Sequence, residues 1–216
     1  MAVTLNALTG SSSGTDASSY NTASVGPGAN RLVLVAVVNR KAAVATLPTL
    51  SGGGMTAWTQ VATILFSTDT RRLTLFRALQ ASPGAAAAIT IDFGGVAQLT
   101  CAWSVAEFIG VDTSGSNGAG AIVQSVTNTG SSVPSLTVTL AAFGSVNNAT
   151  YGAFGLNADT PTINPGTGFA EIHDVAAGGE NARCETEWRN DNDTTVNAST
   201  SDASSQGWGG IAAELA

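Results

Sequence analysis

Short runs of β-branched and aromatic residues, separated by Gly, Pro, Ser and Asn, repeat along most of the chain. In the strongest run, Arg31 to Asn39, every position from Leu32 to Val38 is apolar. Such a run is typical of a strand that is covered on both faces. The segment Ile89 to Phe93 instead alternates between apolar and polar positions, as a strand with one solvent face does. The pattern therefore predicts strands rather than helices.

More than ten segments show one of these two patterns. They span residues 3–7, 31–39, 58–66, 71–79, 89–93, 100–109, 121–127, 136–140, 148–157, 169–175, 183–188 and 208–215. Strands at this spacing, with turn residues between them, predict an all-β fold. We expect an antiparallel two-sheet sandwich with jelly-roll or Greek-key topology.

The chain has 216 residues, and sandwiches of roughly 200 to 250 residues commonly form one domain. We predict a single sandwich domain over residues 31–216. Residues 1–30 are expected to form an N-terminal arm and a first strand of the same domain, with a polar loop at 10–19. The Ser-, Gly- and Asn-rich segment 112–120 is interpreted as a long loop, because neither side of it contains a complete set of predicted strands.

Charged residues make up 11% of the chain, and 8 basic against 15 acidic residues give a net charge of −7. This balance disfavours nucleic acid as a partner. The charge is uneven, with six basic and three acidic residues up to position 100 and two and twelve after it. Cys101 and Cys184 lie far apart and are predicted to be buried, reduced thiols.

Two arrangements could carry catalysis. His173 is followed by Asp174, but neighbours on a strand point to opposite faces, so this aspartate is not placed to orient the imidazole ring. Glu185 and Glu187 share a strand face and could approach the separation of a glycosidase pair. Because Arg183 continues that face with charge, as Arg189 does, a solvated charged strand is the favoured interpretation. We predict no catalytic residue.

Metal and sugar binding have their own candidates. Asp191 and Asp193 have the spacing of hard oxygen ligands for Ca²⁺, but the rest of an EF-hand pattern is absent and an ordinary turn is favoured. We predict no metal and no cofactor. The tryptophans lie in predicted strands, where burial is the default. Tyr20 and Tyr151 are the better candidates for exposed rings that contact a ligand or a sugar.

Six stretches carry a resemblance to a known family. They are residues 28–37 (GANRLVLVAV), 58–61 (WTQV), 72–77 (RLTLFR), 89–93 (ITIDF), 106–112 (AEFIGVD) and 208–215 (WGGIAAEL). In this order they resemble a sandwich domain found in structural proteins of tailed bacteriophages and in some bacterial surface proteins. The resemblance implies a virion component: a capsid decoration or head-fibre protein, or a tail appendage.

The sequence shows no coiled-coil heptads or collagen-like repeat of the kind that tail fibres carry, which favours capsid decoration. We expect a non-enzymatic homo-oligomer that is made in the host cytoplasm without a signal peptide or transmembrane segment. Its expected partners are the major capsid protein or other virion proteins. Two alternatives stay open: a carbohydrate- or receptor-binding sandwich that contacts host surface polysaccharide, and a glycan hydrolase that uses Glu185 and Glu187.

Overall fold

The computed structural model describes residues 2–131, 134–200 and 206–216. These residues form strands and no helix. Eight of the strands precede the segment 112–120. They are β1 (Thr4–Ser13), β2 (Ser19–Val25), β3 (Leu32–Arg40), β4 (Thr49–Gly52), β5 (Thr59–Phe66), β6 (Arg71–Ala78), β7 (Ala87–Asp92) and β8 (Thr100–Ile109).

Eight further strands follow that segment. They are β9 (Ile122–Gly130), β10 (Ser135–Thr139), β11 (Ala149–Leu156), β12 (Ile163–Asn164), β13 (Ala170–Ala177), β14 (Ala182–Arg189), β15 (Thr195–Thr200) and β16 (Trp208–Leu215). Every strand that the sequence predicted overlaps one of these. The polar loop predicted at residues 10–19 is wrong in part, because β1 extends to Ser13 and β2 begins at Ser19.

Four antiparallel sheets result. We call β1-β8-β3-β6-β5 the first large sheet and β2-β7-β4 the first outer sheet. We call β9-β16-β11-β14-β13 the second large sheet and β10-β15-β12 the second outer sheet. The all-β antiparallel sandwich predicted from the sequence is confirmed, although the strands form four sheets rather than two.

The two halves of the chain share one strand order. Adding eight to each strand number of the first half reproduces the pairings of the second half. The pairings of strands 1–8, 8–3, 3–6, 2–7 and 7–4 are those of a jelly roll, while the fifth strand pairs with the sixth. Residues 112–120 contain no strand, as the loop interpretation expected, but each side of them holds a set of eight strands, contrary to the reason given for that interpretation.

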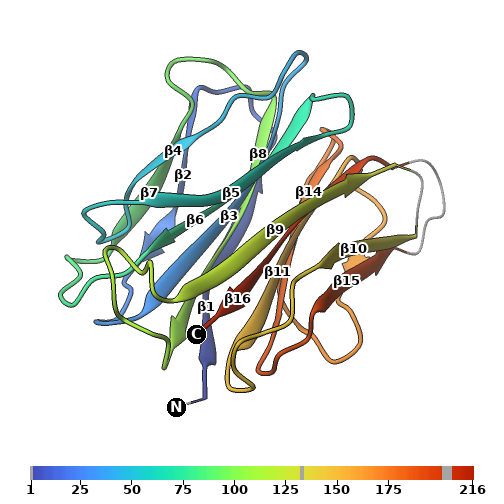
Figure 1. Cartoon of the computed structure of the whole chain (residues 1–216). Coiled ribbons are helices and arrows are strands. Elements are labelled where there is room, and N and C mark those ends of the chain that lie inside the picture. The colour runs from blue at the N-terminus through green and yellow to red at the C-terminus, as the bar shows by residue number, and fades with distance from the viewer. Residues whose placement is uncertain (1, 132–133, 201–205) are drawn as a thin grey trace.

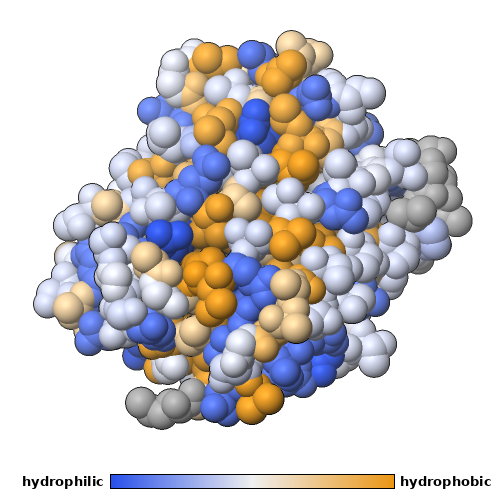
Figure 2. Space-filling model, in the orientation of Figure 1, coloured by the Kyte–Doolittle hydropathy of each residue, from blue (hydrophilic) through white to orange (hydrophobic). Residues whose placement is uncertain are grey.

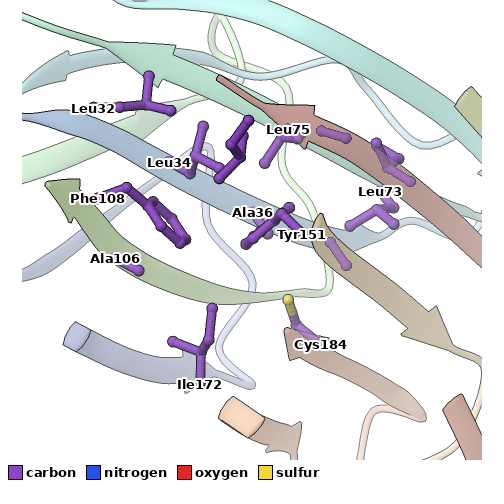
Figure 3. Close-up of a cluster of buried hydrophobic side chains, with 14 of the residues drawn as sticks. Leu32, Leu34, Ala36, Leu73, Leu75, Ala106, Phe108, Tyr151, Ile172 and Cys184 are labelled. Atoms are coloured by element: carbon purple, nitrogen blue, oxygen red, sulfur yellow. The ribbon is translucent and has the colours of Figure 1, made fainter. Parts of the chain in front are cut away.

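The sheets stack in four layers, in the order first outer, first large, second large, second outer. Figure 1 shows β2, β4 and β7 at one side of the molecule and β10 and β15 at the other, with the long strands between them. The central core lies between the two large sheets, and Figure 3 shows Leu34 and Phe108 of one sheet near Tyr151 and Cys184 of the other. Two further cores lie beneath the outer sheets.

Stacking explains the long apolar runs. Both large sheets are covered on both faces, so β3 and β8 are buried along almost their whole length, as are β11 and β16. The two cysteines are buried and free, as predicted. The outer sheets expose one face each, which carries mainly Ser, Thr and Asn. Figure 2 shows a surface of mostly intermediate hydropathy over β10 and β15.

The halves contact each other reciprocally. The edge strand β1 of the first large sheet lies against β13, and the corresponding strand β9 lies against β5. At the strand ends, Arg40 forms a 2.5 Å ion pair with Glu180 in the β13–β14 turn. In return, the Asn157 amide donates a 2.6 Å hydrogen bond to the Ser67 hydroxyl in the β5–β6 turn. The halves thus associate as the subunits of a two-fold dimer do.

Candidate functional site

The charged face of β14 brings several titratable side chains together. The alternation predicted from the sequence is correct, because Cys184 belongs to the central core and Trp188 packs against it. The predicted solvation is wrong. Glu185 and Glu187 are each 0% exposed and Arg183 is 6% exposed. The second outer sheet covers this face, and two of its three strands, β12 and β15, were not predicted.

An ion pair holds one end of this face. The Arg183 guanidinium lies 2.5 Å from the Asp174 carboxylate on the neighbouring strand β13, and both side chains are 8% exposed. Arg183 also donates to the Asp159 carbonyl oxygen. The same Asp174 oxygen accepts from the backbone N–H of Ile163 at 3.2 Å, which ties the large sheet to β12. The pair therefore joins the two layers of the second half.

The candidate calcium ligands lie at the other end and are bound to an arginine. Asp191 and Asp193 each accept a 2.6 Å hydrogen bond from the Arg189 guanidinium. The hydrogen bond to Asp191 and the negative charges of Asp191 and Asp193 raise the pKa of Arg189, although burial acts in the opposite direction. Asp193 also accepts from the backbone N–H of Thr195 at 2.8 Å, as turn aspartates do. Among the residues that the structure describes, no three His, Cys, Asp or Glu side chains converge to hold a metal ion.

His173 lies on the opposite face of β13 and bonds to a serine that sequence reasoning missed. Its Nδ1 atom is 2.9 Å from the Ser104 hydroxyl of the other large sheet. That hydroxyl also contacts Thr186 at 2.7 Å, and Ser104 is only 2% exposed. Burial lowers the pKa of His173, which favours the neutral ring. As predicted, Asp174 does not orient the ring, because it faces Arg183. Nothing in the sequence links a serine on β8 to a histidine on β13.

The two tyrosines proposed as exposed rings are buried. Tyr20 is 5% exposed, and its hydroxyl donates to the carbonyl oxygens of Thr15 and Gln98 at 2.9 and 3.0 Å. Burial raises the pKa of Tyr20 to about 12. Tyr151 is 1% exposed and packs edge-on against Phe108, with ring centroids 5.9 Å apart. Neither ring presents a platform for a sugar, so that expectation of exposure is wrong.

The tryptophans divide into two groups. Trp103 and Trp208 are each 4% exposed, in agreement with the prediction of burial. Trp58 and Trp188 are partly exposed. The Trp58 indole N–H donates to the Gly52 carbonyl oxygen at 3.2 Å, which fixes this ring against the first outer sheet. For Trp58 and Trp188 the burial predicted from the sequence is therefore only partial.

A buried glutamate occupies the same place in each half. In the first half, Glu107 is 1% exposed and accepts hydrogen bonds from Asn6 at 2.7 Å and from Arg31 at 2.5 Å. The Gly28 backbone N–H donates to its second oxygen at 2.9 Å. Burial alone would raise the pKa of Glu107, but these three hydrogen bonds and the Arg31 charge together lower it.

In the second half, Glu214 is 0% exposed and accepts from Gln124 and Asn148, both at 2.6 Å. Gln124 corresponds to Asn6 by strand register, and Asn148 immediately precedes β11 as Arg31 precedes β3. Both glutamates lie in strands that the sequence predicted, but the sequence pattern assigns neither of them a role. The matching contacts show that the two halves correspond at this position.

These observations define an all-β antiparallel sandwich with a duplicated jelly-roll strand order, whose ionisable groups are mostly bound within the fold. No pocket is present over the described residues, and none of their segments is a helix long and apolar enough to cross a membrane. No family model, no curated protein and no solved structure matches the chain.

Proposed function

We propose that this chain is a structural protein of a tailed bacteriophage particle, and that it binds the assembled capsid surface as a decoration protein. The observation that carries the proposal is the four-layer stack. Two jelly-roll halves share a central core, and their carboxylates are largely used in internal contacts. A molecule of this kind can bind other proteins through its outer faces, which supports a structural role rather than a catalytic one.

The two outer faces supply that surface. Residues that alternate with the buried ones point outward on each outer sheet, and nearly all of them carry a hydroxyl or an amide. They include Ser19, Asn21, Thr49, Ser51 and Thr90 on the first outer sheet and Ser135, Thr137, Thr139, Asn164, Thr195, Asn197 and Ser199 on the second, while Ala23, Ala88 and Asp92 are exceptions. Because the two sheets are equivalent in strand order and lie on opposite sides of the stack, the chain presents two similar faces, of which one can bind the capsid while the other points away from it.

The test uses the whole chain and capsids assembled without it, from the phage that encodes it. We expect saturable co-sedimentation of the chain with these capsids, and occupied capsids should no longer take up labelled chain. Capsids from an unrelated phage are the control. Absence of binding to the cognate capsids would overturn the proposal. Binding to host polysaccharide in place of capsids would favour the carbohydrate-binding alternative.

A further inference from the structure

Glu185 and Glu187 are two residues apart on β14 and lie on the same face of that strand, which the second outer sheet covers. Both side chains are 0% exposed. Of their four carboxyl oxygens, only Oε2 of Glu187 has a hydrogen-bond partner, the backbone N–H of Gly166 at 2.8 Å. A buried carboxylate with unpaired oxygens is very costly, whereas a buried protonated carboxyl costs much less.

The strand β13 adds acids rather than compensating cations. Across the register, Asp174 pairs with Glu185, and Glu171 pairs with Glu187. The cation on this side, Arg183, is bound to Asp174. The carboxyl of Glu185 therefore faces further negative charge and receives no hydrogen bond from the arginine.

The other elements that surround Glu185 and Glu187 provide no unpaired basic side chain that could neutralise them. Arg189 is occupied by Asp191 and Asp193. On the other side, β11 faces the pair with Gly152 and Phe154. The three strands of the second outer sheet, which lie above, contain no titratable residue at all. The chemistry that can neutralise these two carboxylates is a proton.

The first half shows that this layer does not need acids. Val33 and Thr150 pair with the equivalent glutamates Glu107 and Glu214, so the registers of the halves can be aligned. This alignment places Thr74 and Phe76 at the positions of Glu185 and Glu187. There, the Thr74 hydroxyl bonds to that of Thr63, opposite it on β5, at 3.0 Å. Neutral residues close the first half, whereas the second half carries an acidic pair in the same place.

We propose that Glu185 and Glu187 form a buried proton-binding pair that latches the second outer sheet onto the second large sheet, and that loss of these protons releases it. The first outer sheet has no such latch.

The direction of the pH dependence follows from the environment of the pair. Burial, and then the neighbouring Glu187, raises the pKa of Glu185 well above its usual range. Burial raises the pKa of Glu187 from 4.5 to about 8. A carboxyl whose pKa is raised by folding stabilises the closed layer fully below the unfolded pKa. That contribution is lost as the pH rises to the folded pKa. The latch is therefore strongest in mild acid and weakens up to about pH 8.

Hydrogen exchange of the whole chain between about pH 5 and pH 9 tests the latch. After correction for the intrinsic pH dependence of exchange, protection of β10 and β15 should fall by about tenfold per pH unit for each buried carboxyl that ionises. Protection of β2 and β7 is the internal control and should stay constant. In the Glu185→Gln/Glu187→Gln variant, protection of β10 and β15 should no longer depend on pH.

Parallel loss of protection in both outer sheets would overturn the proposal, as would an unchanged pH dependence in the variant. A second measurement needs no variant. Infrared spectra of the unmodified chain should contain the band of protonated carboxylic acids at neutral pH, and this band should disappear at alkaline pH. If the band is absent at neutral pH, the pair is ionised and the latch does not exist.

Discussion

Arg183 compensates a buried acid in the second half. Its guanidinium is the cation bonded to Asp174, and both groups lie under the second outer sheet. Replacing Arg183 by Met keeps much of the side-chain volume but leaves the carboxylate buried without its cation. We expect the free energy of unfolding to fall by about 3–5 kcal/mol. Urea unfolding at neutral pH, followed by circular dichroism, measures this loss.

Arg72 is the matched control, because it occupies the equivalent position on β6. Its guanidinium donates to two neutral groups, the Ala45 carbonyl oxygen at 3.0 Å and the Thr63 hydroxyl at 3.1 Å. Arg72→Met therefore leaves no unpaired charge, and the expected loss is about 1–3 kcal/mol. Equal losses in the two variants would contradict the assignment of Arg183 as the compensating cation.

The residues of β14 also show what its sequence pattern can predict and what it cannot. The alternation of charged and apolar positions correctly separated Glu185 and Glu187 from Cys184. It could not tell which side faces water, because charge on a strand normally indicates solvent. Here the second outer sheet covers the charged side, and the signal of that sheet in the sequence is weak.

At the scale of the elements, β11 and β16 are brought close to β5 by glycines. Gly155 and Gly209 pair across the two strands, and the Phe66 ring lies over both. A Cβ atom at Gly155 would lie 2.8 Å from Cζ of Phe66 and 3.1 Å from Cγ2 of Val38. These glycines therefore set the approach of one large sheet to the other.

Gly155→Val should force the large sheets apart and lower the free energy of unfolding by about 1–3 kcal/mol. Thermal unfolding of the variant and the parent measures the change. Gly178→Ala is the control, because a Cβ atom there meets nothing within 4 Å. Its expected effect stays within about 0.5 kcal/mol. A Gly155→Val variant as stable as the parent would show that the interface between the sheets can relax.

The strands missed from the sequence share a physical reason. They are β2, β4, β12 and β15, and all four belong to the outer sheets. Their solvent faces carry small polar residues, so each contributes few apolar positions; β12 spans only Ile163–Asn164. In the large sheets, burial of both faces demands apolar residues throughout, and the sequence signal is correspondingly strong.

At the scale of the whole molecule, the chain is arranged as two jelly-roll halves that associate like a two-fold dimer. The uneven charge along the sequence contributes to this association, since Arg40 of the first half pairs with Glu180 of the second. The arginine Arg71 also donates to the Asn181 carbonyl oxygen across the same boundary at 3.0 Å. Arg40 and Glu180 therefore bring one pair of opposite charges together at the boundary between the halves.

A cut between the halves tests this arrangement. A protease site inserted between Gly115 and Ser116, which are both exposed, should be cleaved without separating the halves. The central core and the reciprocal contacts join the two fragments, so they should co-elute in native gel filtration and separate in denaturant. The uncleaved insertion variant is the control. Separate elution of the fragments in native buffer would contradict the dimer-like association.

The sequence by itself determined the all-β class, the strands of the large sheets and the burial of both cysteines, because apolar periodicity reports how many faces of a strand are covered. The duplication could not be found in this way. Equivalent positions hold residues as different as Phe76 and Glu187, and only strand register aligns them. The burial of the acidic pair was likewise decided by the tertiary structure, since it depends on an outer sheet whose polar strands pack over β14.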